Sequence, residues 1–91
     1  MNPHPAPRPL PEPYFHDDSG TVRFWVRTEA GDAVGASIAR QVLHHRFKAA
    51  IGGVDALDSY LEHRATVDAA VLRRVARGSI EPVMVREHDL A

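Results

Sequence analysis

Residues 55 to 78, DALDSYLEHRATVDAAVLRRVARG, carry the longest helical pattern in the chain. Apolar residues and one arginine recur there at spacings of three and four, which places them along one side of a helix. These residues are Leu57, Tyr60, Leu61, Arg64, Val67, Val71 and Val75. Acidic residues occur at the start of the stretch and arginines at its end, which is the order that the helix dipole favours. Gly78 suits the position after the last helical turn. The pattern predicts one uninterrupted helix, whose apolar side must pack on another part of the chain because an isolated helix is marginal in water.

The residues before this helix predict a small sheet. Thr21–Arg27 (TVRFWVR) is rich in β-branched and aromatic residues, which favours a strand. Alternation along this strand places three side chains toward the helix, namely Val22, Phe24 and Val26. The opposite side carries Arg23, Trp25 and Arg27. Two further strands are predicted beside this one, Tyr14–His16 before it and Ala33–Ile38 after it. The connecting turns are Asp17–Gly20 and Thr28–Asp32. In the second turn, Gly31 can adopt positive φ without strain. We therefore expect a three-stranded antiparallel meander.

The remaining segments complete the expected architecture. Ala39–Ala50 has helical spacing, with Ser37 as one candidate cap, although the strand alternation runs through that residue to Ile38. Glu81–Arg86 (EPVMVR) predicts a last strand, with Pro82 at its first residues or on an edge because proline lacks an N–H. The predicted fold class is α+β in two layers. It is an antiparallel sheet of three to four strands, in the chain order β-β-β-α-α-β, with two helices on one face.

Proline occupies every odd position from Pro3 to Pro13. Each proline restricts its own φ and pushes the preceding residue to extended geometry, so we expect a stiff arm of polyproline-II type. Alternate prolines contain no PxxP pair, the usual ligand pattern of proline-recognising domains. The chain therefore divides into a proline-rich extended or disordered arm over residues 1–13 and a single α+β domain over residues 14–91.

Composition narrows the class of protein. The 91 residues carry a net charge of −1, whereas a dedicated binder of nucleic acid or anionic membranes usually has a clear basic excess. The sequence contains no cysteine, so neither a disulfide nor a thiolate metal site can form. No apolar run approaches the roughly 20 residues of a membrane span. These observations predict a cytoplasmic protein with no bound cofactor and no membrane partner.

Motifs along residues 14–90 together resemble a known family. They are a V-x-F strand (Val22, Phe24), the segment Ile38–Leu43, an aromatic–x3–Arg step (Tyr60, Arg64) with Val67 three residues on, and a closing Asp89-Leu90 pair. With these motifs the chain resembles a small uncharacterised bacterial family, the domain of unknown function 1488. Ala39 stands where that family has a helix-capping serine, and the proline arm lies outside the resemblance. The resemblance implies a compact α+β fold and no established activity.

Histidines and serines offer no recognisable catalytic pattern. Six histidines are present, but no HExxH motif and no zinc-ligand spacing occurs among them. A composite metal site would combine His44 or His45 with His63, and His16, His45 or His63 would be the candidate general bases. The chain has neither a glycine-rich nucleophile elbow nor a phosphate loop. The sequence thus favours a protein without catalytic or metal-ligating residues.

The candidate interaction surface consists of one aromatic side chain and six arginines. These are Trp25, Arg23, Arg27, Arg64, Arg73, Arg74 and Arg77. Arg64 interrupts the apolar side of the long helix, where it either binds an anion or pairs with Asp68 four residues on. The arginines near the end of the helix suit nucleic acid, with Trp25 stacking on a base, but the helix dipole alone also favours cations there.

Three functions follow from these features, in order of preference. The first is a small non-enzymatic interaction or regulatory module, whose partner is an unknown protein or, as a homodimer, a second copy. The alternative is a nucleic-acid-binding accessory protein that uses Arg73, Arg74 and Arg77. The third is a small metal-binding protein or enzyme.

Overall fold

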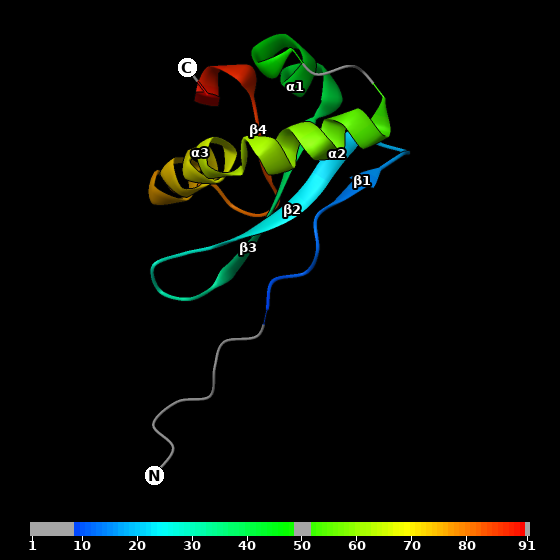
Figure 1. Ribbon diagram of the computed structural model, residues 1–91. Coiled ribbons are helices and arrows are strands. Elements are labelled where there is room, and N and C mark those ends of the chain that lie inside the picture. Colours follow the sequence, from blue (N-terminus) through cyan, green and yellow to red (C-terminus); the bar gives the residue numbers. More distant parts are fainter. Residues whose placement is uncertain (1–8, 49–51, 91) are drawn as a thin grey trace.

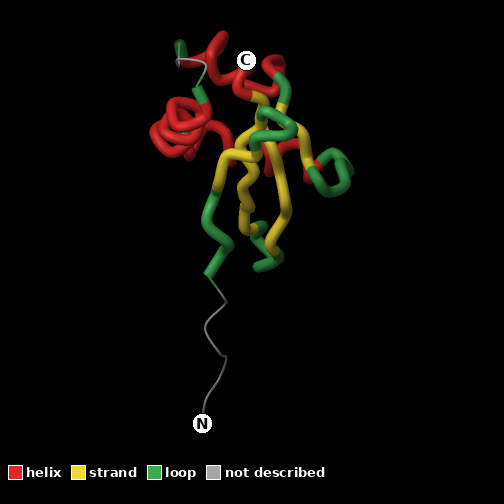
Figure 2. Tube along the Cα trace, turned by 90° about the vertical axis from the view of Figure 1, so that its right-hand side faces the viewer, coloured by secondary structure: helices red, strands yellow, loops and turns green. Residues whose placement is uncertain are grey.

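A four-stranded sheet carries helices on one face in the computed structural model of the chain, which describes residues 9–48 and 52–90 (Figure 1). In chain order the elements are β1 (Tyr14–His16), β2 (Thr21–Arg27), β3 (Ala33–Ala39), α1 (Arg40–Phe47), α2 (Gly53–Glu62), α3 (Arg64–Ala76), β4 (Val83–Val85) and the 3-10 turn η1 (Glu87–Leu90). The α+β class and its two layers are thereby confirmed. The view in Figure 2 shows that the segment before β1 points toward the same end of the sheet as the β2–β3 turn.

The first three strands form the predicted antiparallel meander. Phe15 of β1 lies opposite Val22 of β2, and Trp25 of β2 lies opposite Gly35 of β3. Gly20 and Gly31 adopt φ values of 66° and 92° in the two connecting turns, a region that side chains rarely enter. The prediction of positive φ at Gly31 is confirmed.

The fourth strand makes the sheet mixed rather than fully antiparallel as expected. β4 lies beside β3 and runs parallel to it, with Ser37 opposite Met84. Between these two strands the chain passes through α1, α2 and α3, and parallel neighbours require a long crossover of this kind. Pro82 immediately precedes β4, which is an edge strand, in agreement with the expected position of a residue that cannot donate a hydrogen bond.

The predicted long helix is two helices, so the described layer has three helices instead of two. α2 ends at Glu62 and α3 begins at Arg64, with the backbone of His63 at φ −106° and ψ 22°. No glycine or proline marks this bend. A straight helix of 22 residues would be roughly 33 Å long, whereas four strands are only about 19 Å wide. The bend lets α2 contact β1 and β2 while α3 contacts β4.

α1 begins later than its candidate cap. Ser37 lies within β3, and Ala39 occupies the N-cap position without a side-chain hydrogen bond. The N–H of Arg40 donates instead to the carbonyl of Gly20, at 3.0 Å. The β1–β2 turn therefore supplies one of the acceptors that a capping serine would have provided.

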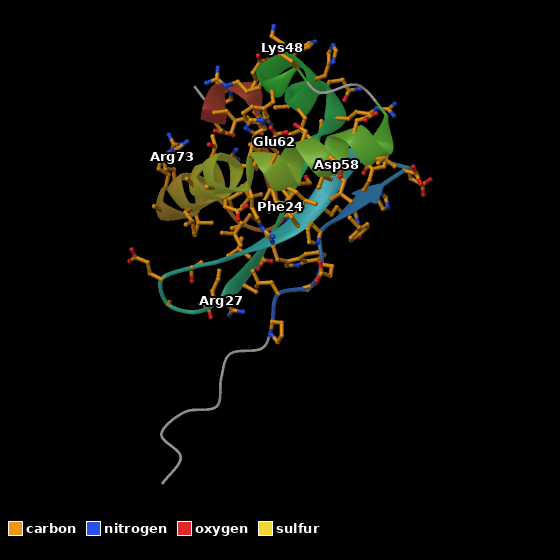
Figure 3. The ribbon with its side chains drawn as sticks, viewed as in Figure 1. Phe24, Arg27, Lys48, Asp58, Glu62 and Arg73 are labelled. Carbon is orange, nitrogen blue, oxygen red and sulfur yellow. The ribbon has the colours of Figure 1, made fainter. Side chains whose placement is uncertain are left out.

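The core lies between the sheet and the helices. The three side chains predicted to point inward from β2 are buried, as are Val34, Ala36 and Ile38, which alternate along β3. They meet Tyr60 and Val67 of the helical layer. The rings of Phe24 and Tyr60 have their centroids 4.4 Å apart, within the range of a favourable aromatic pair. Asp58 and Glu62, labelled in Figure 3, belong instead to the exposed side of α2.

One hydrogen bond spans the bend between α2 and α3. The hydroxyl of Tyr60 donates to Oδ1 of Asp68 at 2.8 Å, although residues eight apart in a straight helix are separated by about 12 Å along its axis. Arg64 pairs with Asp68, with Nε 3.7 Å from Oδ2, which is the local partner expected from the sequence. Burial raises the pKa of Asp68, and the Tyr60 hydrogen bond and the Arg64 charge offset this only in part.

Asp68→Asn tests this balance. The raised pKa means that the folded state binds a proton at Asp68 more readily than the unfolded state, so stability from this group is present at low pH and is lost as pH rises through the folded pKa. An asparagine oxygen still accepts from Tyr60 without the cost of burying a charge. Urea unfolding should therefore show a larger gain for the variant over the native chain at pH 7 than at pH 4.5. An equal difference at both pH values would contradict the prediction.

Candidate interaction surface

The side of the sheet opposite the helices is the candidate surface, and we call it the open sheet face. It carries the alternate residues of all four strands that point away from the core. They are Tyr14 and His16 of β1, Thr21, Arg23, Trp25 and Arg27 of β2, Ala33, Gly35, Ser37 and Ala39 of β3, and Met84 of β4. The helices of the described residues all lie on the other side (Figure 1). Three of the predicted site residues, Arg23, Trp25 and Arg27, are thus brought together.

Trp25 lies beside Gly35, its neighbour on β3. A Cβ at Gly35 would lie 3.5 Å from the indole Nε1, which is an ordinary contact, and 3.3 Å from Oε2 of Glu81, which is a tight one. The missing side chain therefore leaves room for the Glu81 carboxylate close to β3. Tyr14 lies beside Trp25, with ring centroids 6.2 Å apart. On the far side of Gly35, Oε2 of Glu81 accepts a hydrogen bond of 2.9 Å from the Gly35 N–H.

A cavity of about 390 Å³ opens on the face around these aromatic rings. Tyr14, Trp25, Pro82 and Met84 line it, together with Arg23. Tyr14 is 41% exposed and Met84 is 57% exposed. Large apolar side chains gathered in one exposed place are typical of sites that bind another molecule.

The edges of the sheet are less accessible to another chain than its open face is. Pro13 directly precedes β1 and has no N–H to donate. At the other edge, the carbonyl of Met84 accepts from Nη1 of Arg74 at 3.1 Å. Both edge strands have three residues. Short strands, proline and arginine at the edges of a sheet reduce pairing with further strands.

Arg73 and Arg74 hold the C-terminal segment and do not lie on the open sheet face. Arg74 donates from Nη1 to Oδ2 of Asp89 at 2.8 Å and from Nε to Oγ of Ser79 at 3.0 Å. Arg73 donates to the carbonyl of Asp89 at 2.7 Å. Arg77 follows the last turn of α3 and is exposed. Arg73 and Arg77 also line a second cavity of about 470 Å³, together with Ala76, His88 and Asp89.

Asp89 is the buried acceptor at the centre of this segment. Burial alone would raise its pKa, but the hydrogen bond from the Arg86 N–H and the guanidinium of Arg74 outweigh that effect and hold the pKa below its usual value. Arg46 adds a further donor, from Nη2 to the carbonyl of Leu90 at 2.7 Å. These contacts fasten η1 to α1 and α3.

The histidines take separate positions. The ring of His63 stacks on Phe47 at 3.9 Å with an interplanar angle of 6°, and the rings of His44 and His45 are 5.5 Å apart. Nδ1 of His16 is 2.7 Å from Oγ of Ser19 in the β1–β2 turn. Within residues 9–48 and 52–90, no three histidine or acidic side chains are grouped so that they could hold a metal ion. Over the same residues, no helix has the length and apolar character to cross a membrane.

Part of the open sheet face cannot be located from the sequence. The sequence predicts a strand at Tyr14, and the register shows that this residue shares a face with Arg23. Met84 and Glu81 reach the site because β4 pairs with β3, and a three-residue strand carries no pattern that reveals its neighbour. Gly35 alternates with the inward residues of β3, which is the one sequence observation that could have placed it under Trp25.

Comparison with solved structures supports the fold. The chain is similar to a protein of unknown function from the domain of unknown function 1488 family of Shewanella loihica PV-4, with a TM-score of 0.69 and 14% sequence identity. The match covers 81% of this chain and 85% of the other. No family model matches the sequence, and no curated protein matches it. The resemblance to this family, which the motifs predicted, is confirmed at the level of the fold.

Asp89→Asn tests the role of the arginines in holding the C-terminal segment. The amide removes the buried charge that Arg74 and the Arg86 N–H now satisfy, so we expect a loss of about 2–4 kcal/mol in unfolding free energy at pH 7. Because the pKa of Asp89 is lowered in the folded state, its contribution is present at neutral pH and is lost as pH falls through the folded pKa.

The difference between the native chain and the Asp89→Asn variant should therefore shrink when urea unfolding is repeated near pH 3. Asp58→Asn is a matched control because Asp58 is exposed on α2. Equal stability of the native chain and Asp89→Asn at pH 7 would refute the structural role given to this carboxylate.

Proposed function

We propose that this protein is a small non-enzymatic interaction module that self-associates by burying the open sheet face. The observation that carries the proposal is the one-sided sheet, whose uncovered face gathers Tyr14, Trp25 and Met84 around a cavity of about 390 Å³. Aromatic residues, methionine and arginine are the side chains enriched at the centres of protein interfaces. The face has all three types.

The charges on this face support a second copy as the partner. Arg23 and Arg27 lie on β2, while Glu81 lies just before β4 on the other side of Gly35. In a two-fold dimer the same surface of both copies meets, so a surface that carries both signs can complement itself. A purely basic face would instead favour an acidic partner.

Nucleic acid receives less support as the partner. Arg73 and Arg74, which the sequence offered for this role, already donate to Asp89, Ser79 and Met84. Those donors would have to be released before they contacted phosphate. The cytoplasmic location of the module remains a prediction from sequence.

Trp25→Ala tests the proposal. Removal of a central aromatic side chain commonly costs 2 kcal/mol or more of binding free energy, which corresponds to roughly a thirtyfold weaker dimer. Light scattering after size exclusion should show a dimer for the native chain and a monomer for the variant at the same concentration. Leu61→Ala is the control, because Leu61 is an exposed apolar residue of the helical layer.

The native chain contains a single tryptophan, so its fluorescence reports on Trp25 alone. Emission should move to longer wavelength as the native dimer is diluted. Circular dichroism of Trp25→Ala checks that its sheet and helices are retained. A native chain that stays monomeric at the highest accessible concentration would overturn the proposed function.

A further inference from the structure

We propose that the open sheet face binds the proline-rich arm, residues 1–13, of a second copy, so that two copies exchange their arms. This inference rests on the proposed self-association and names the segment that fills the face. The structure describes residues 9–13 of the arm, and the remainder enters the argument through its sequence.

The chemistry of the cavity suits proline. Extended proline-rich segments bind in aromatic-lined grooves, because their conformation is largely preformed and their rings pack flat on aromatic side chains. Tyr14 and Trp25 supply two aromatic rings in the cavity, and Pro82 and Met84 add further apolar surface. A PxxP pair serves domains that offer successive pockets. A single cavity needs only one turn of such a helix, which is three residues long, and residues 7–9 (Pro-Arg-Pro) supply one turn.

The length of the arm also fits. Thirteen residues in polyproline-II geometry span about 40 Å, and four strands are about 19 Å wide. An arm is therefore long enough to leave its own domain and still cross the partner's sheet.

The arm and the face carry charges of opposite sign. Arg8 lies six residues before Tyr14, which is about 18 Å in an extended proline-rich segment, so it can reach beyond its own domain. On the face, the Glu81 carboxylate lies beside β3, where its Oε2 accepts from the Gly35 N–H. An arm that crosses the partner's face with its prolines over Trp25 brings Arg8 near Glu81.

The arm cannot easily occupy the face of its own domain. It continues directly from β1, and residues 9–13 run toward the end of the sheet that carries the β2–β3 turn (Figure 1). A return across the same face would require a reversal close to Pro11 and Pro13, where φ is restricted and the preceding residues favour extended geometry. Leu10 and Pro13 are half-buried in their own domain, so the residues before them are the part of the arm offered to a second copy.

The first experiment replaces prolines in the full chain. Pro5, Pro7 and Pro9→Gly removes ring contacts and preorganisation of the arm while leaving Pro11, Pro13 and the folded domain unchanged. We expect the dissociation constant of the dimer, from light scattering and dilution fluorescence, to rise about tenfold or more. Trp25 emission should shift to longer wavelength at a concentration where the native chain is still dimeric.

The second experiment tests the direction of the arm by exchanging charges. Arg8→Glu and Glu81→Arg should each weaken the dimer by about tenfold, because every dimer contains the contact twice. The double variant should recover most of the affinity, since the pair is restored with reversed signs. Arg77→Glu makes the same charge change at the end of α3 and should leave the dimer intact.

A synthetic peptide of residues 1–12 provides the third measurement. Added to the native dimer, it should compete with the exchanged arms and yield monomers whose Trp25 emission stays at short wavelength. A peptide with the four prolines at positions 3, 5, 7 and 9 replaced by glycine is the matched control and should have no effect.

The outcomes separate the two levels of the proposal. If Trp25→Ala gives monomers while the proline and charge variants remain dimeric, the two sheets pack directly on each other. In that case arm exchange is overturned and the proposed self-association stands. If the native chain is a monomer, both fail. Restored dimerisation in the Arg8→Glu, Glu81→Arg double variant supports arm exchange in particular.

Discussion

The contact between the rings of Phe24 and Tyr60 joins the two layers of this fold. Phe24 projects from the central part of β2 and Tyr60 from the last turns of α2, and both are fully buried. The hydroxyl of Tyr60 must still find a partner in this position, because a buried polar group without a hydrogen bond is costly. Asp68 provides that partner from α3. One aromatic contact thus links the sheet to both helices that flank the bend.

Because every described helix packs on the Phe24 side of the sheet, no described helix covers the other side (Figure 1). In a small two-layer domain the second face of a sheet usually carries polar residues and faces water. Here it carries Arg23 and Arg27, as expected for such a face, and also a half-buried tryptophan beside an exposed tyrosine and methionine. The arginines keep the face soluble, and the apolar centre favours contact with another chain.

The arginines illustrate how one residue type takes two roles in the same protein. Arg74 contacts a carboxylate, a hydroxyl and a carbonyl, and these contacts stabilise the C-terminal segment and cover the outer edge of β4. A planar guanidinium with several donors suits such a position, where three acceptors converge. Arg23 and Arg27 project from β2 on the open sheet face, where Nη1 of Arg27 donates to the carbonyl of Gly31 at 2.8 Å. Composition cannot separate these roles, because the difference lies in which acceptors the fold brings near each side chain.

Local sequence patterns specified the meander, the inward and outward sides of its strands, the helical nature of residues 55–76 and a last strand with Pro82 at its start or on an edge. Each of these depends on periodicity or on a local backbone restriction, which neighbouring residues encode. The bend at His63, the parallel pairing of β4 with β3 and the meeting of Trp25, Gly35 and Glu81 were decided by the tertiary structure alone. They depend on distances between segments far apart in the chain, where the need to cover a twisted sheet and satisfy buried polar groups outweighs local preference.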